Sequence, residues 1–264
     1  MTSPDGRANN EMEELMSLPE VVSREEWLAA REQLLVREKD LTRRYDAVNA
    51  QRRRLPMVRI DKDYVFEGAD GKAGLLDLFQ DSSQLVIYHL MFDPAWEKAC
   101  PGCTASMDET SAATLAHLKL RDTRFAAVSR APYAKIAPYG AARGWAFPWY
   151  SSFGSDFNYD FHVTLDAAVA PVVYNYRTQA ELVKLDPEWA SEGPTEMPGF
   201  SCFLRDRDAL FHTYSTYARG TEPADGTYGL LDLTAFGRQE DWEEPKGRAP
   251  KVNPADPRLL LTDW

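Results

Sequence analysis

The chain has 264 residues, of which 44% are hydrophobic and 27% charged, a composition typical of a globular protein rather than a disordered or fibrous one. Its formal net charge of −11 argues against a surface that binds nucleic acid or an anionic membrane without help. Three cysteines are too few for a framework of structural disulfides.

The chain carries no sign of export or membrane insertion in its apolar segments. Residues 1–14 contain acids and no apolar core, so we expect no secretory signal. The longest apolar run, Leu85–Phe92, is far shorter than a membrane span. We therefore expect a soluble, cytoplasmic protein.

A long helix is predicted over residues 23–55, ended by Pro56. Ser23 and Glu26 have the spacing of a capping box. Apolar side chains recur every seven residues along the helix: Trp27, Leu34, Leu41, Val48 and Leu55. Because several intervening heptad positions are polar, we do not predict a continuous coiled coil. We expect an arm that packs on its own domain or on a second subunit, which makes a homodimer through this helix one expected partner interaction.

The central part of the chain changes to the pattern of a sheet. A strand and turn are predicted from Tyr64 and a short helical turn over residues 75–79. The run Leu85–Phe92 suits a central strand buried on both faces. A helix over Thr104–Leu120 and a second buried strand over Arg124–Ser129 complete a strand–helix–strand unit.

The remaining elements are predicted from weaker signals. A helix over Pro132–Arg143 should end at Gly144, and strands at Ser201–Arg205 and Ala209–Tyr214 should form an antiparallel hairpin. Gly226–Phe236 is predicted as a last helix. Three parts follow from these elements: residues 1–56 as a helical arm, 57–240 as the main domain, and 241–264 as an extended proline-containing tail.

Cys100 and Cys103 stand at the junction between the buried strand and the following helix. At this position the free amides and the positive end of the helix dipole favour a thiolate. Cys103 lies one helical turn later, where it could attack a mixed disulfide formed at Cys100. Pro101 suits the first turn because its missing N–H would be unpaired there. The pattern predicts a redox-active dithiol that needs no cofactor and acts on protein or small-molecule thiols and disulfides.

Two other interpretations of the cysteine pair stay open. A zinc site would need two more ligands, for which His89 and His117 are the nearest candidates, but no second paired motif supplies them. The thiols could also be incidental to a protein that only binds partners. Such a non-catalytic adaptor is the main alternative to an enzyme.

Several stretches of the sequence resemble a bacterial family of thioredoxin-like proteins, labelled a domain of unknown function and described as predicted dithiol–disulfide isomerases. The matching segments are Leu18–Trp27, Pro56–Val58, Asp63–Glu67, Tyr88–Asp93, Cys100–Cys103, Val128–Pro132, Phe147–Phe161, His212–Gly220 and Gly237–Trp242. The resemblance implies an α/β, thioredoxin-like fold: a central mixed sheet flanked by helices, with a long N-terminal helical extension. The function it implies is that of a thiol–disulfide oxidoreductase.

The resemblance also raises a third function, that of a thiol peroxidase related to peroxiredoxins. Peroxiredoxins place Pro seven and Thr or Ser three residues before the reactive cysteine. Asp93 and Glu97 hold those positions for Cys100, so the peroxide pocket of that family is not encoded.

A few further residues are candidates for the site or for the core. Thioredoxin folds present a cis-proline opposite the dithiol, and Pro198, before the strand with Cys202, has a similar placement. Lys98 and Arg130 are cations that could stabilise a Cys100 thiolate. His89 is interpreted as a hydrogen-bonded core histidine, and Cys202 as a small buried hydrophobe. The aromatic segment 147–161 is expected to cover the sheet, with a substrate groove or a dimer surface as alternatives.

Overall fold

The computed structural model describes residues 21–185, 187–190, 193–224, 230–231, 234 and 236–237. The chain divides into two compact units, the first ending at Tyr45 and the second starting at Asp46. Most of the predicted last helix and all of the predicted tail lie outside the described residues. The boundaries expected after residues 56 and 240 stay predictions.

Helix α2 (Arg24–Arg52) confirms the long N-terminal helix, with 29 residues. The capping box at its start is formed: the Ser23 N–H donates to Glu26 Oε2 at 2.9 Å, and the Glu26 N–H donates to Ser23 Oγ at 3.2 Å. The heptad row of apolar residues is exposed: Trp27, Leu34, Leu41 and Val48. The helix therefore presents an apolar row along one side.

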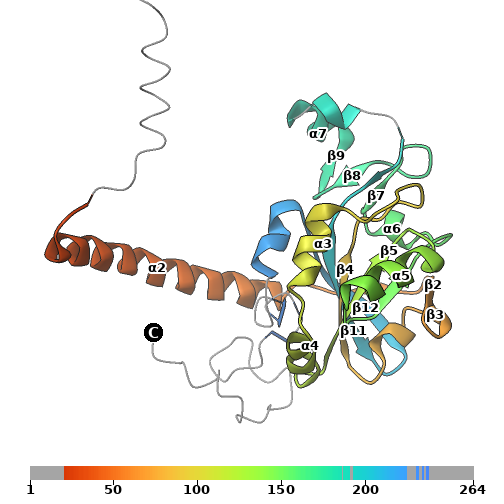
Figure 1. Cartoon of the computed structure of the whole chain (residues 1–264), viewed down its shortest axis with the longest axis horizontal. Coiled ribbons are helices and arrows are strands. Elements are labelled where there is room, and N and C mark those ends of the chain that lie inside the picture. Colours follow the sequence, from red (N-terminus) through yellow and green to blue (C-terminus); the bar gives the residue numbers. More distant parts are fainter. Residues whose placement is uncertain are drawn as a thin grey trace, which may run out of the picture. The chain divides into compact units, whose positions relative to one another are not determined.

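The second unit contains an eight-stranded mixed sheet in the order β1-β12-β11-β4-β5-β6-β2-β3. Figure 1 labels β4, β5, β11 and β12 of its centre. Its strands are β1 (Val58–Ile60), β2 (Val65–Gly68), β3 (Gly71–Gly74), β4 (Gln84–His89), β5 (Thr123–Ser129), β6 (Trp149–Ser151), β11 (Gly199–Asp206) and β12 (Ala209–Tyr217). The β4–β5 and β5–β6 pairs are parallel and the other pairs antiparallel. The predicted hairpin is confirmed as β11–β12, with both strands longer than expected.

The four central strands have the arrangement of the thioredoxin fold. Strands β4 and β5 are parallel and joined by helices, and the β11–β12 hairpin lies antiparallel on the other side of β4. The order β12-β11-β4-β5 thus contains the expected strand–helix–strand unit followed by a hairpin. The predicted fold class, α/β and thioredoxin-like with a mixed sheet, is confirmed.

The prediction of a single helix over Thr104–Leu120 was wrong. The segment forms two helices, α3 (Pro101–Asp108) and α4 (Ala112–Lys119). Ser111 starts the second helix because its Oγ accepts from the Thr114 N–H at 3.1 Å, as an N-cap serine does. The residues between Asp108 and Ala112 therefore separate two helices.

Shorter elements complete the described chain. Helix α5 (Tyr133–Arg143) ends at Gly144 as predicted, where φ is +67° and the left-handed backbone favours glycine. The other elements are η1 (Asp77–Phe79), α6 (Phe157–Asp160), β7 (Thr164–Leu165), β8 (Val173–Tyr174), β9 (Arg177–Thr178), α7 (Gln179–Leu185), η2 (Pro187–Ala190), β10 (Thr195–Glu196) and η3 (Ala218–Ala224). Within the described residues no helix has the length and apolarity needed to cross a membrane.

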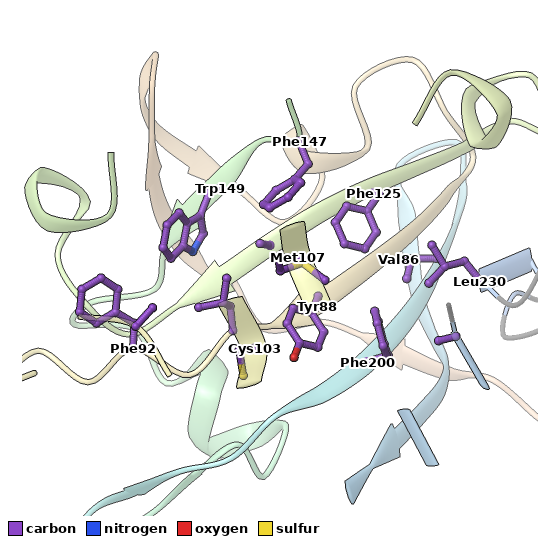
Figure 2. Packing of buried hydrophobic residues seen from close by; sticks show 14 of the residues in the cluster. Val86, Tyr88, Phe92, Cys103, Met107, Phe125, Phe147, Trp149, Phe200 and Leu230 are labelled. Atoms are coloured by element: carbon purple, nitrogen blue, oxygen red, sulfur yellow. The ribbon is translucent and has the colours of Figure 1, made fainter. Parts of the chain in front are cut away.

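The two faces of the sheet carry separate cores. Residues of β4 alternate between them, so that Val86 and Tyr88 join Cys103 and Met107 of α3 (Figure 2), while Leu85 and Ile87 lie in the other core. We call the first side the dithiol face and the second side the opposite face. Most of the aromatic segment 147–161 is buried in these cores, as expected, although Phe153 is exposed.

His89 confirms the expected core histidine on the opposite face. Its Nε2 lies 2.8 Å from Ser201 Oγ, and its ring packs against Phe157 and Phe161. Burial lowers the pKa of His89 to about 3, so the ring is neutral at pH 7.

The depressed pKa of His89 predicts a loss of stability in mild acid. At a pH below the unfolded-state pKa of about 6.5, His89 binds a proton in the unfolded chain but stays neutral in the folded chain. The free energy of unfolding should therefore fall by roughly 1.4 kcal/mol for each pH unit between 6 and 4 through His89 alone. Urea unfolding across this range would measure it, with His89→Asn as comparison. An equally steep decline in that variant would contradict the assignment to His89.

Candidate active site

Cys100 and Cys103 occupy the start of α3, directly after the loop that leaves β4. Cys100 is the N-cap residue, its N–H donates to the Met91 carbonyl at 3.0 Å, and its own carbonyl accepts from the Thr104 N–H at 2.9 Å. Both cysteines are free thiols; Cys100 is partly exposed, whereas Cys103 is buried. The pair therefore combines one accessible sulfur with one shielded sulfur.

The buried thiol of Cys103 is held in its protonated form at neutral pH. Burial raises the pKa of Cys103 to about 11. Hydrogen bonds from the Tyr88 side chain and from the backbone of Met91 act in the other direction and stabilise the thiolate. These two donors are the groups that the folded chain provides for a negative charge on Cys103.

Tyr88 is a residue of this site that the sequence analysis missed. It lies on β4 with 4% of its surface exposed, and its hydroxyl points toward the sulfur of Cys103 (Figure 2). Burial first, and then the neighbouring Cys103, raise the pKa of Tyr88. One signal was present: a tyrosine inside a fully buried strand needs a partner for its hydroxyl.

Pro198 comes to the same end of the sheet as the two cysteines. It directly precedes β11, whose first residue Gly199 is paired with His89, the last residue of β4. The Pro198 carbonyl accepts from the Tyr174 hydroxyl at 3.4 Å, and the same hydroxyl accepts from the Ala218 N–H at 3.0 Å. Burial is the main cause that raises the pKa of Tyr174, and the hydroxyl of Tyr174 is held between the backbone of Pro198 and that of Ala218.

Arg130 binds two carboxylates instead of standing free beside Cys100. Its guanidinium pairs with Asp93, after β4, and its Nε donates to Glu196 Oε1 at 2.6 Å. Glu196 is 2% exposed in its side chain and also accepts from Thr164 Oγ1 at 3.0 Å. Because Glu196 lies two residues before Pro198, this cluster ties the proline segment to the loop that leads to the dithiol.

Removing Arg130 should destabilise the fold strongly. In Arg130→Ala the buried Glu196 carboxylate loses its cation, and breaking a buried pair in this way costs about 3–5 kcal/mol. Urea unfolding would measure the loss. The control is Arg143→Ala, which breaks an exposed pair with Asp108 and should cost far less than Arg130→Ala, because water screens an exposed ion pair. Similar losses in both variants would show that the Arg130 cluster adds nothing beyond a surface pair.

The remaining candidates from the sequence are Lys98, a metal site and Cys202. Lys98 is exposed and makes no ion pair with any residue that the structure describes. The described residues contain no group of three or more His, Cys, Asp or Glu side chains placed to hold a metal ion. Cys202 is 1% exposed, and burial raises its pKa to about 12, which confirms it as a small buried hydrophobe.

Known proteins similar to this chain were found among solved structures. A cysteine-to-serine mutant of peroxiredoxin Q from Xanthomonas campestris is 16% identical, with a TM-score of 0.41, over 65% of this chain and 90% of that one. Peroxidoxin BcpB from Mycobacterium tuberculosis is 12% identical, with a TM-score of 0.42, over 68% of this chain and 96% of that one. No curated protein matches the sequence.

A family model covers nearly the whole chain. It matches residues 16–254 and describes a bacterial protein of unknown function (DUF899). This match confirms the family indicated by the sequence motifs and spans both the N-terminal helix and the dithiol. The chain belongs to this family of bacterial proteins of unknown function.

Proposed function

We propose that the protein is a thiol–disulfide oxidoreductase in which Cys100 attacks and Cys103 resolves. The observation that carries the proposal is the pairing of a partly exposed thiol at a helix N-terminus with a buried thiol one turn later, whose charge two donors can stabilise. This is the asymmetry that thiol–disulfide exchange requires.

The proposed reaction passes two electrons from the dithiol to a substrate disulfide. The Cys100 thiolate attacks one substrate sulfur, forms a mixed disulfide and expels the other substrate sulfur as a thiolate. Cys103 then loses its proton and attacks Cys100 Sγ. The second substrate thiolate leaves, the Cys100–Cys103 disulfide forms, and an external thiol reduces it for the next cycle.

Tyr88 and Pro198 are assigned supporting roles in this proposal. The Tyr88 hydroxyl stabilises negative charge on Cys103 when that sulfur becomes the nucleophile. Pro198, held by Tyr174 and by the segment around Glu196, would form the surface against which a substrate disulfide lies. The partners are then proteins or small molecules that carry thiols or disulfides.

The proposal is tested by equilibrating the full-length protein with mixtures of reduced and oxidised glutathione. Cys100 and Cys103 should form one disulfide in a single two-electron transition, and Cys202 should stay reduced throughout. The midpoint would show whether the protein serves as a reductant or as an oxidant. The proposal would be overturned if Cys100 and Cys103 formed no disulfide at any ratio of reduced to oxidised glutathione, or if the disulfide included Cys202.

A thiol peroxidase is the second candidate function, favoured by the partly exposed sulfur of Cys100 at a helix N-terminus. In that reaction the thiolate would be oxidised by a peroxide to a sulfenic acid, which Cys103 would then condense to a disulfide. Peroxide consumption measured beside disulfide reduction separates the two. Disulfide exchange is favoured because Asp93 and Glu97 stand where peroxiredoxins have Pro and Thr or Ser before the reactive cysteine.

We also propose that α2 pairs with α2 of a second copy in antiparallel orientation. The helix has Glu25 and Glu26 in its first turn and Arg52 in its last, so antiparallel pairing places acids opposite a base beside the exposed apolar row. Light scattering of the full chain should give twice the mass of one chain. Leu34→Lys combined with Leu41→Lys should give a monomer, and a monomeric wild type would refute the pairing.

A further inference from the structure

A cavity of about 360 Å³ lies on the opposite face of the sheet, away from the dithiol. Residues of β1, the end of α6, the β8–β9 turn and β12 line it. Six aromatic rings form its walls: Tyr64, Phe161, His162, Tyr176, His212 and Tyr217. Small-molecule sites commonly have this size and combine apolar walls with a few polar groups.

Tyr176 stands in this wall at a local conformational cost. Asn175 and Tyr176 form the two-residue turn between β8 and β9, with φ of +48° and +62°. Turns of this type strongly favour Asn followed by Gly, because the second residue also needs positive φ. A tyrosine there is strained, yet its ring lines the cavity and its hydroxyl donates to the Ser215 carbonyl at 2.8 Å.

His162 is a second aromatic residue of the cavity with positive φ, at +54°. Its ring is partly buried, and burial lowers its pKa, so the ring is neutral at pH 7. Among the described residues its ring nitrogens have no hydrogen-bond partner. His162 therefore offers the cavity an unused donor and an unused acceptor.

A β-bulge gives the cavity a polar side at His212 and Ser215. These residues are three apart on β12, so in a regular strand they would point to opposite faces. The pairing of β11 and β12 skips Thr213, which turns both side chains to the same side, with His212 Nε2 2.7 Å from Ser215 Oγ. Bulges that redirect a side chain in this way are common beside functional sites.

The hydrogen bonds continue from this pair into the core. Ser215 Oγ lies 2.8 Å from Ser201 Oγ, which in turn lies 2.8 Å from His89 Nε2. Hydroxyl groups can donate in either direction along such a chain. Burial lowers the pKa of His212 as well, so the polar side of the cavity carries no charge at neutral pH.

The charged residues around the cavity are paired with each other. Arg59 Nε lies 2.8 Å from Asp61 Oδ1, and Lys62 Nζ lies 2.6 Å from Asp160 Oδ2. The lining therefore presents two cations and two carboxylates that neutralise one another. Such a lining offers no unpaired charge to an ionic ligand, and it favours a neutral one.

We propose that this cavity binds a small, uncharged aromatic compound that carries a hydroxyl group. The ligand ring packs among the aromatic walls, with Tyr176 as the outer wall, and the hydroxyl group bonds to His162. The site is separate from the dithiol and does not depend on the proposed redox function.

The test uses phenol as the probe, in saturation-transfer NMR with the full-length reduced protein. Toluene lacks the hydroxyl, cyclohexanol lacks the aromatic ring, and benzoate carries a charge. Phenol should receive saturation and bind at least about fivefold more tightly than each of the three, the effect expected of one hydrogen bond or one aromatic contact. No transfer to phenol, or equal binding of any of the other three compounds, would overturn the proposal.

Two variants locate the binding in this cavity. Tyr176→Gly creates the preferred Asn-Gly turn and should keep the fold, while the Kd for phenol rises about five- to tenfold. His162→Asn keeps a residue that tolerates positive φ and should raise the Kd by a similar factor. Phe153→Ala removes an exposed aromatic ring outside the cavity and should leave the Kd unchanged. Unchanged binding in both cavity variants, with native circular dichroism, would refute the site.

Discussion

Replacing Cys100 by serine should reduce the rate of disulfide reduction to the uncatalysed background, a loss of about two orders of magnitude or more. The attacking group must be a thiolate, and a serine hydroxyl is not ionised near neutral pH. Cys103 cannot substitute for it, since Cys103 is buried and burial raises its pKa to about 11. Insulin reduction with a thiol donor would measure the rates.

The other two cysteines provide the comparisons for this assay. Cys103→Ser should turn over much more slowly than the wild type, because the mixed disulfide at Cys100 then has no internal nucleophile and only the external thiol donor can resolve it. Cys202→Ala should retain the wild-type rate, since Cys202 is buried in strand β11 and takes no part in the proposed reaction. Equal activity in Cys100→Ser and the wild type would exclude the proposed role of the dithiol.

Replacing Tyr88 by phenylalanine should slow the resolving step by about 10- to 100-fold, the range expected for one hydrogen bond to a charged group. The Tyr88 side chain lowers the pKa of Cys103 by bonding to it, against the effect of burial. Without the hydroxyl, burial acts unopposed by this bond, so the pKa of Cys103 rises. At a given pH a smaller fraction of Cys103 is then available as the thiolate nucleophile.

Stopped-flow decay of the mixed disulfide, followed from pH 7 to pH 10, measures this effect. The decay rate should rise with pH in the wild type and in Tyr88→Phe, and the curve of rate against pH should be shifted to higher pH in Tyr88→Phe. Tyr150→Phe is the control, because Tyr150 is a half-buried tyrosine packed against the core of the opposite face. If the decay curve of Tyr88→Phe matched that of the wild type, the Tyr88 hydroxyl would not stabilise the Cys103 thiolate.

The sequence predicted the parts of this protein that depend on local pattern. The apolar run before Cys100 indicated a buried strand, Pro101 indicated a helix start, and the capping box at Ser23 indicated the N-terminal helix. In each case the signal lies within a few residues of the element that it predicts. The comparison with thioredoxin folds pointed to Pro198, which lies far from the cysteines along the chain and whose role in the site stays a prediction.

The features that were missed depend on contacts between distant segments. Hydropathy counts Tyr88 as one more apolar residue of the strand, and only the position of α3 shows that its hydroxyl faces Cys103. The break at Ser111 was missed because the apolar period continues across it. The bulge at Thr213 depends on how β12 pairs with β11, and no residue type in β12 predicts it.

The most direct test of the central claim is to map the mixed disulfide formed with oxidised glutathione. Mass spectrometry of Cys103→Ser should find one glutathione, attached to Cys100, and Cys100→Ser should carry none on Cys103 over the same time. This result would identify Cys100 as the attacking sulfur and Cys103 as the shielded one. Glutathione on Cys103 in Cys100→Ser, at the rate seen for Cys100, would contradict the assignment of the two roles.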